Sequence, residues 1–358
     1  MNQQIRFCRS FDGTRIAYSV TGEGPPIVRS PHWLTHVEYE WDSPLWRPWI
    51  DEMSRSYTYL RMDERACGLS DWEVKDISFE SWVRDFEAVI DAAGIERFAL
   101  FGASQGSSIA IEYAVRHPER VTHLVLLGGY SRGWLKRGPP PDRVAELEAL
   151  LKLVEVGWGR EDPAYRQIYS TQFIPGATLE ELASFSELQR RSCSPENAVR
   201  IIRSMFTINV TDSAPRLRCP TLVLHARGDR RAPFEEGRVL ASLIPGSRLV
   251  PLETDNHILL KREPAFQRFF DELRAFIPPR TAAGNGQGFP ELTGRESQIL
   301  EHIARGLDNA QIAAHLSLSE KTVRNHITHI FDKIGVENRS QAIVLARERG
   351  LGLQSRPS

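Results

Sequence analysis

Short apolar runs alternate with longer amphipathic segments along the first three quarters of this chain. Segments with helical periodicity lie between most of the runs, such as residues 79–93, which Gly94 ends as a C-terminal cap. Asp12-Gly13, between the first two runs, is typical of a hairpin turn. An opening hairpin followed by β-α alternation predicts an α/β fold with a mostly parallel sheet. The strand-like runs are residues 6–9, 16–19, 27–30, 58–62, 98–101, 123–127, 222–225 and 248–251.

The alternation is interrupted between Tyr130 and Leu222, where no strand-like run occurs. This position predicts a helical cap, at about residues 131–213, that covers the sheet and roofs a ligand pocket. The alternative is a set of surface helices with no part in a pocket. The helix-like segments of the interval are residues 143–156, 164–172, 179–191 and 196–209.

A stretch without periodicity divides the chain into two unequal parts. Residues 280–289 are rich in Gly and Ala and follow a Pro pair, which is typical of a flexible linker. We therefore expect one domain at residues 1–279 and a second, small and all-helical, at residues 290–358.

Composition narrows the class of protein. Hydrophobic residues make up 41% of the chain, and no apolar run is long enough to span a membrane. The polar N-terminus lacks the apolar stretch of a signal peptide, so we expect a cytoplasmic protein. The four cysteines are scattered without metal-ligand spacing, which predicts reduced packing residues and neither metal nor cofactor. The net charge is −1, so any affinity for nucleic acid must come from a local basic cluster.

A serine at a strand-to-helix turn is the first candidate for chemistry. Ser104 lies in Gly102-Ala103-Ser104-Gln105-Gly106, where the two glycines permit a strained backbone and close packing. A serine hydroxyl needs a base and an orienting acid to become nucleophilic. Asp229 and His257, each just after a strand-like run, supply both, although each alone could be a turn or loop residue. His225 is a rival histidine, but its place inside a strand favours a hydrogen-bonded core role.

The order Ser, Asp, His, with each member at the end of a strand, resembles the α/β-hydrolase family over residues 6–277. Asp63-Glu64-Arg65-Ala66-Cys67-Gly68-Leu69-Ser70 is similar to the D-x-R-x-x-G-x-S loop of that family. The resemblance implies a catalytic triad of Ser104, Asp229 and His257. It also implies an oxyanion hole made by the backbone N–H groups of Trp33 and Gln105. Pro31-His32 stands where the family has His-Gly, a departure that predicts a weakened hole and slow turnover.

Tryptophans gather after the third strand-like run, close to the expected mouth of the pocket. We expect His32 and Trp33 to line the ligand pocket, where an indole ring offers a large apolar contact area. Trp46 and Trp49 are three residues apart, which favours packing of a helix against the sheet.

Two arginines interrupt apolar runs. Arg29 and Arg61 fall inside strand-like segments, and a buried guanidinium needs a partner. A structural ion pair with a nearby carboxylate, such as Asp63 or Asp85, is favoured over contact with an anionic substrate.

The last part of the chain carries helix signals of its own. Thr293-Gly294-Arg295-Glu296 and Asp308-Asn309-Ala310-Gln311 are capping boxes, each of which begins a helix. Ser319 caps a third helix at residues 320–334, and residues 340–349 form a fourth. The third helix has a polar, basic face opposite an apolar stripe of Val323, Ile327, Ile330 and Ile334.

Residues 292–351 resemble the LuxR-type helix-turn-helix family. Leu292-Thr293-Gly294-Arg295-Glu296 matches its L-T-x-R-E motif, and the run from Lys321 to His326 matches K-T-V-x-x-H. The resemblance implies that the third helix enters the major groove of double-stranded DNA, and that the fourth forms a homodimer. A helical bundle with solvated charges is the alternative. The implied base contacts are Arg324, Asn325 and Thr328, and the implied phosphate contacts are Lys321, Thr322, Lys333 and Arg339.

Three functions fit this combination. The first is a one-component transcription regulator whose α/β-hydrolase domain binds, and slowly hydrolyses, a small and partly apolar ligand such as an ester or lactone. The second is a serine hydrolase in which the small domain is a regulatory or oligomerising appendage. The third is a ligand-binding relic of a hydrolase without turnover. The motifs of the small domain are complete and the oxyanion segment departs from its pattern, which favours the first.

Overall fold

The computed structural model describes residues 2–158, 160, 162–279, 289, 292–316, 318–349 and 351–352. The chain divides into two compact units, residues 1–279 and 280–358, and each is considered by itself. The expected linker at residues 280–289 lies, apart from Phe289, outside the described residues. Within the described part, no helix combines the length and apolar character needed to cross a membrane.

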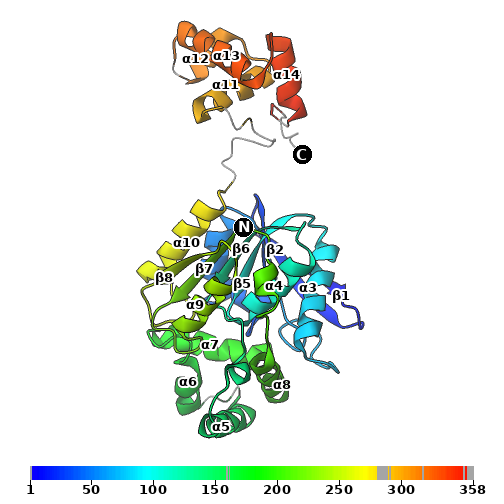
Figure 1. Cartoon of the computed structure of the whole chain (residues 1–358), viewed down its shortest axis with the longest axis vertical. Coiled ribbons are helices and arrows are strands. Elements are labelled where there is room, and N and C mark those ends of the chain that lie inside the picture. Colours follow the sequence, from blue (N-terminus) through cyan, green and yellow to red (C-terminus); the bar gives the residue numbers. More distant parts are fainter. Residues whose placement is uncertain are drawn as a thin grey trace. The chain divides into compact units, whose positions relative to one another are not determined.

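The larger unit is built on one eight-stranded sheet with the order β1-β2-β4-β3-β5-β6-β7-β8 (Figure 1). β1 and β2 form the expected hairpin, β2 pairs antiparallel with β4, and the remaining pairs are parallel. Each expected strand is present, with its ends within two residues of the prediction. The strands are β1 (Gln4–Arg9), β2 (Arg15–Thr21), β3 (Pro26–Arg29), β4 (Thr58–Met62), β5 (Phe98–Ala103), β6 (Val121–Leu127), β7 (Thr221–Ala226) and β8 (Arg248–Leu252).

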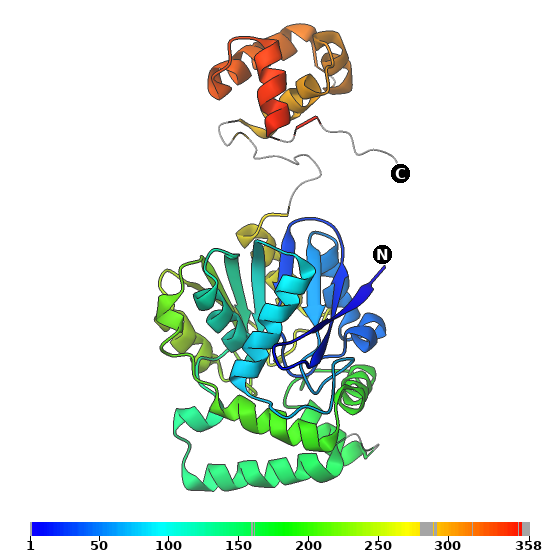
Figure 2. The same ribbon diagram turned by 90° about the vertical axis from the view of Figure 1, so that its right-hand side faces the viewer.

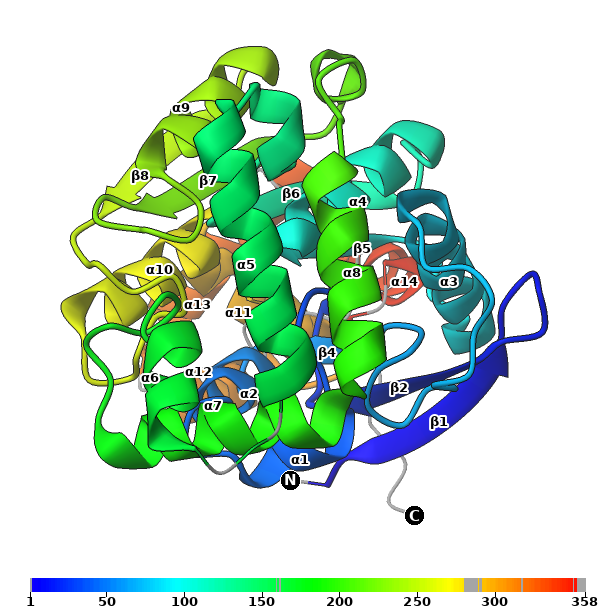
Figure 3. The same cartoon turned by 90° about the horizontal axis from the view of Figure 1, so that it is seen from below.

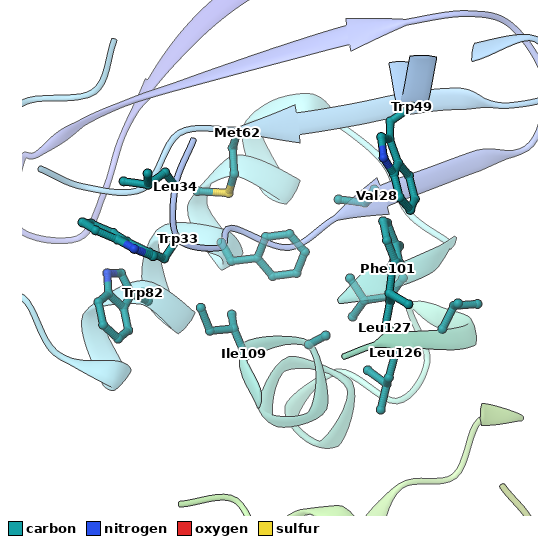
Figure 4. Packing of buried hydrophobic residues seen from close by; sticks show 14 of the residues in the cluster. Val28, Trp33, Leu34, Trp49, Met62, Trp82, Phe101, Ile109, Leu126 and Leu127 are labelled. Carbon is teal, nitrogen blue, oxygen red and sulfur yellow. The ribbon is translucent and has the colours of Figure 1, made fainter. Parts of the chain in front are cut away.

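Helices cover both faces of the sheet, which explains why its central strands are buried throughout. α3 has the boundaries predicted for it, because Ser78 forms a capping box with Ser81 and Gly94 takes the left-handed conformation that ends the helix. Figure 4 shows apolar side chains meeting between the layers, where the indole of Trp49 stacks on the ring of Phe101. The helices of the two faces are α1 (Val37–Asp42), α2 (Arg47–Ser54), α3 (Phe79–Ala93), α4 (Gln105–Arg116), α9 (Phe234–Leu243) and α10 (Pro264–Phe276).

A helical cap is inserted between β6 and β7, in the interval that lacks strand-like runs. Seen from below, α5 and α8 run side by side across the end of the sheet, with α7 crossing beside them (Figure 3). Figure 2 shows the same helices as a separate layer under the carboxyl ends of the strands. The cap therefore covers the edge at which the parallel strands deliver their functional loops. Its helices are α5 (Pro141–Gly157), α6 (Pro163–Ser170), α7 (Leu179–Ser192) and α8 (Pro195–Thr207).

The smaller unit consists of four helices around a core of its own. Both expected capping boxes are present, since Thr293 pairs with Glu296 and Asp308 pairs with Gln311. On the third helix, Val323, Ile327 and Ile330 are buried, as its apolar stripe predicted. The helices are α11 (Gly294–Ala304), α12 (Asn309–Leu316), α13 (Glu320–Ile334) and α14 (Arg339–Glu348).

Candidate functional site

Ser104 occupies a sharp turn between β5 and α4. Its backbone has φ 50° and ψ −124°, and Ala66 is the only other described non-glycine residue with positive φ. A Cβ at Gly102 would lie 2.7 Å from the Cα of Ser107, and one at Gly106 would lie 2.6 Å from the carbonyl oxygen of Pro31. The two flanking glycines are therefore required by close backbone packing, and the strained turn presents the serine at the start of a helix.

Asp229 and His257 form a direct hydrogen bond at the ends of neighbouring strands. The Nδ1 of His257 lies 2.6 Å from Oδ2 of Asp229, and both side chains are almost fully buried. The other carboxylate oxygen accepts the backbone N–H groups of Arg231 and Ala232 at 2.8 and 2.9 Å. Burial opposes ionisation of Asp229, but the adjacent His257 and these hydrogen bonds hold its pKa below the usual value. The carboxylate can thus fix the tautomer and orientation of the imidazole.

Ser104 and His257 line one cavity under the cap. Its volume is about 40 Å³, enough for a few water molecules. The cavity reaches from the serine back between the sheet and α2, where its walls are largely aromatic. His32 and Trp33 both line it, as expected, but so do Trp46 and Trp49, which we assigned to packing alone. The two indoles do both, because each is buried in the core while one face borders the cavity.

His225, the rival histidine, has a core role. Its Nε2 bonds the carbonyl oxygen of Ala232 at 2.7 Å, and the ring is fully buried. Burial lowers its pKa, so the ring is neutral. The preference for a hydrogen-bonded core role is confirmed.

The backbone N–H of Trp33, expected in the oxyanion hole, already has a partner. It donates to Oε1 of Gln105 at 3.1 Å, and Nε2 of Gln105 in turn donates to Oε1 of Glu64 at 2.8 Å. Burial raises the pKa of Glu64 to about 8, so this carboxyl is mostly protonated at neutral pH. The side chain of Gln105, the residue after Ser104, thus accepts the N–H of Trp33, one of the two donors expected in the oxyanion hole.

The Trp33 side chain connects this hydrogen-bonded group to the cap. Its indole Nε1 donates to the hydroxyl of Tyr169 on α6 at 2.9 Å, and its ring lies 5.3 Å from that of Trp158. A ligand under the cap would therefore contact the same residue that carries the candidate oxyanion donor. Glu64, Gln105 and Tyr169 were not predicted in these roles, because their contacts join segments far apart in the chain.

The two buried arginines share a carboxylate that the sequence did not indicate. Nη2 of Arg29 lies 3.0 and 2.9 Å from the two oxygens of Glu40, and Arg61 also bonds Glu40. The expectation of a structural ion pair is confirmed, but the partner is Glu40 and neither of the suggested carboxylates, Asp63 and Asp85. Asp63 instead accepts the backbone N–H groups of residues 37 and 69, and Asp85 pairs with a third arginine, at residue 65. Glu40 lies on α1, a helix of six residues, and so short a pattern does not show which of its faces points inward.

In the small unit, the N-terminal half of α13 presents a polar, basic face. Lys321, Arg324, Asn325 and Thr328 are exposed, and Thr322 is half-buried beside its capping serine. A helix with such a face has the dimensions of the DNA major groove, and its first turns would reach base edges.

Two residues expected to contact phosphates are bound within the unit itself. The ammonium of Lys333 bonds both oxygens of Glu296, at 2.9 and 2.7 Å. The guanidinium of Arg339 bonds Oδ1 of Asn309 at 3.0 Å and the carbonyl oxygen of Leu307. Both cations therefore tie α13 and α14 to the segments before them.

The described residues contain no group of three or more His, Cys, Asp or Glu placed to hold a metal ion. The four cysteines are free in the structure, and Cys67 and Cys193 are buried.

Both units resemble known protein families. Residues 290–346 match the family model of bacterial regulatory proteins of the luxR family, and residues 37–154 match that of the alpha/beta hydrolase fold. RutD of Klebsiella pneumoniae, predicted to be a carbamate hydrolase, is 29% identical over 48% of this chain and 62% of its own. The AB hydrolase superfamily protein YisY of Bacillus subtilis is 26% identical over 66% of this chain and 86% of its own.

Among solved structures, an esterase from Exiguobacterium antarcticum superimposes with a TM-score of 0.63 at 22% identity, covering 76% of this chain and 99% of the esterase. This likeness shows the fold of the larger unit. Together with the family models, it establishes that the chain joins an α/β-hydrolase-fold domain to a C-terminal helix-turn-helix domain of the LuxR family.

Proposed function

We propose that this protein is a one-component transcription regulator. Its hydrolase-fold domain binds a small, partly apolar ligand beneath the cap, and the occupied state changes how a homodimer binds double-stranded DNA. The observation that carries the proposal is the coexistence of a LuxR-family DNA-binding domain with a small, largely aromatic cavity at which the expected oxyanion donor, the N–H of Trp33, is bonded to Gln105. Aromatic walls with a few polar groups suit the binding of a partly apolar ligand, and an occupied oxyanion donor suits slow turnover.

The direct test measures DNA binding with and without cavity ligands. Full-length protein would be used to select duplexes from a randomised pool, and the enriched duplex would then be titrated in the presence of short esters and lactones. We expect at least one such compound to change the affinity several-fold. Ligand control would be contradicted if the affinity of the protein for the selected duplex stays the same with every compound that binds the cavity.

DNA recognition by the helix-turn-helix domain is tested separately with Arg324→Ala. Losing a side chain that pairs with guanine should weaken binding to the selected duplex by about 1–3 kcal/mol and relax the preference at one base position. Arg305→Ala is the matched control, because it removes the same charge from an exposed residue of the small unit outside α13. An Arg324→Ala protein that keeps full affinity and full preference would remove this residue from base recognition.

A serine hydrolase is the second candidate, and the Asp229–His257 pair favours it. In this mechanism His257 takes the proton of Ser104 as the serine oxygen attacks the ester carbonyl, and Asp229 stabilises the imidazolium. The imidazolium then gives this proton to the leaving alcohol as the ester C–O bond breaks, and water hydrolyses the resulting acyl-enzyme. The wild type and Ser104→Ala would be treated with a fluorophosphonate probe and a panel of short aryl esters. Labelling and turnover that vanish in the variant would show a working nucleophile. If the folded wild type is not labelled, the hydrolase proposal fails and only the receptor role remains.

A further inference from the structure

The cavity lining includes a buried cation. Arg29 is 3% exposed and lines the cavity together with Tyr59, Trp46, Trp49 and Phe101, and Ser104 lines the same cavity. Placing a guanidinium against aromatic walls costs solvation energy that an apolar residue would not cost. The position of Arg29 therefore calls for an explanation beyond packing.

The ion pairs around Arg29 leave positive charge in excess. Arg29 and Arg61 are both buried and both bond the single carboxylate of Glu40. Asp63 is the next acid nearby, but burial raises its pKa to about 7, so it carries only part of a negative charge at neutral pH. His32, which also borders the cavity, is neutral, because burial lowers its pKa to about 3.

Arg29 also has unused hydrogen-bonding capacity. Among the described residues, its Nε–H has no hydrogen-bond partner, although the atom is buried. A buried donor without an acceptor is unfavourable, and one that is charged is more so. An anionic acceptor inside the cavity would satisfy both the free N–H and the excess charge.

We propose that the cavity, which at about 40 Å³ must widen to admit an organic ligand, recognises a small compound with a carboxylate, and that Arg29 binds this carboxylate. Where the compound is also an ester, the ester carbonyl faces Ser104 and the carboxylate lies at the far end of a short acyl chain. A neutral hydroxyl or amide could accept the N–H bond but would leave the charge uncompensated, so a carboxylate fits better. This inference deepens the proposed function, because it names the ligand class of the same cavity.

The first test uses the full chain with Ser104→Ala, which prevents turnover. Monomethyl succinate and dimethyl succinate have the same chain and differ in whether one end is charged. Their dissociation constants would be measured by calorimetry at neutral pH. We expect the half-ester to bind at least about tenfold more tightly. Equal binding, or tighter binding of the neutral diester, would overturn the proposal without any need for an arginine variant.

The second test locates the contact with a matched pair of variants in the same background. Arg29→Met removes the cation that lines the cavity and leaves Glu40 paired with Arg61, whereas Arg61→Met removes the cation outside the cavity lining and leaves Glu40 paired with Arg29. We expect the preference for the half-ester to disappear in Arg29→Met and to persist in Arg61→Met. Loss of the preference in both folded variants alike would refute a direct contact with Arg29.

The outcomes also separate this inference from the proposed function. A preference for the half-ester without fluorophosphonate labelling of the wild type would mean a carboxylate receptor. Labelling without that preference would mean a hydrolase with neutral substrates, and the carboxylate inference would fail while the catalytic candidate survived. The half-ester should also be the compound that changes DNA affinity; a carboxylate that binds without this effect would contradict ligand control only.

Discussion

The backbone N–H of Trp33 donates to the side-chain oxygen of Gln105, the residue directly after the candidate nucleophile, at 3.1 Å. In a serine hydrolase both residues are expected to offer their N–H groups to the oxyanion. Here the side chain of Gln105 accepts the N–H of Trp33 instead. An ester could use the Trp33 donor only after Gln105 has moved, and Gln105 is held in place by Glu64.

Gln105→Met removes the acceptor while keeping most of the side-chain volume. We expect faster hydrolysis of short aryl esters, because the loss of one oxyanion donor costs roughly 10²–10³ in rate and the variant would restore that donor. The gain should appear in kcat more than in KM. Gln189→Met, a buried glutamine of the cap that bonds Ser170, is the matched control. Slower hydrolysis in Gln105→Met alone would mean that the Gln105 side chain supports the hole.

Glu64 should make the stability of the larger domain depend on pH. Burial raises the pKa of Glu64 to about 8 in the folded state, against about 4.3 in an unfolded chain. Between these values the folded state binds more protons, so the free energy of unfolding falls as pH rises from about 4.5 to 8. Glu64→Gln removes this loss and keeps an oxygen acceptor for Gln105. We expect the variant to gain roughly 3–5 kcal/mol relative to the wild type between these limits.

Urea unfolding at pH 5 and at pH 8 would measure this difference. The raised pKa of Asp63 acts in the same direction and is present in both proteins, so it cancels in the comparison. A difference between the two proteins that does not change with pH would contradict a protonated Glu64.

Lys321 and Lys333 should behave differently, although both were expected to contact phosphates. Lys321 is exposed, so Lys321→Ala should weaken binding to all duplexes and reduce the slope of log affinity against log salt by about one. Lys333 is bound to Glu296, so Lys333→Ala should lower the melting temperature of the small domain and leave that slope unchanged. Titrations at several salt concentrations, with thermal melts of both variants, would decide. A changed slope in Lys333→Ala would mean that Lys333 does contact a phosphate of the DNA.

The expected homodimer can be tested with a single substitution on α14. Ala342 and Ala346 of this helix are fully buried in the small domain, so deleting the helix would disrupt the fold as well as any dimer. Val344 is 57% exposed and projects from the same helix. Val344→Arg should shift the molecular mass in analytical ultracentrifugation from dimer to monomer, with Ala314→Arg, an exposed residue of α12, as the control. A dimer that persists in Val344→Arg would place the interface elsewhere.

Local patterns were sufficient for much of this protein. Capping boxes, glycines at helix ends and short apolar runs depend on neighbouring residues, so the boundaries of α3, β4 and α13 could be predicted from the sequence to the residue. The family motifs around Ser104 and along α13 have the same local character, and they were enough to recognise both domains.

The tertiary structure decided which segments that are distant in the chain come into contact. Glu40 as the shared partner of Arg29 and Arg61, and Gln105 as the partner of Trp33 and Glu64, depend on the order of strands in the sheet. The same holds for Lys333, whose position in a motif suggested DNA while its folded neighbour is Glu296. A charge or an N–H group finds its partner by proximity in space, and sequence spacing specifies that proximity only within one element.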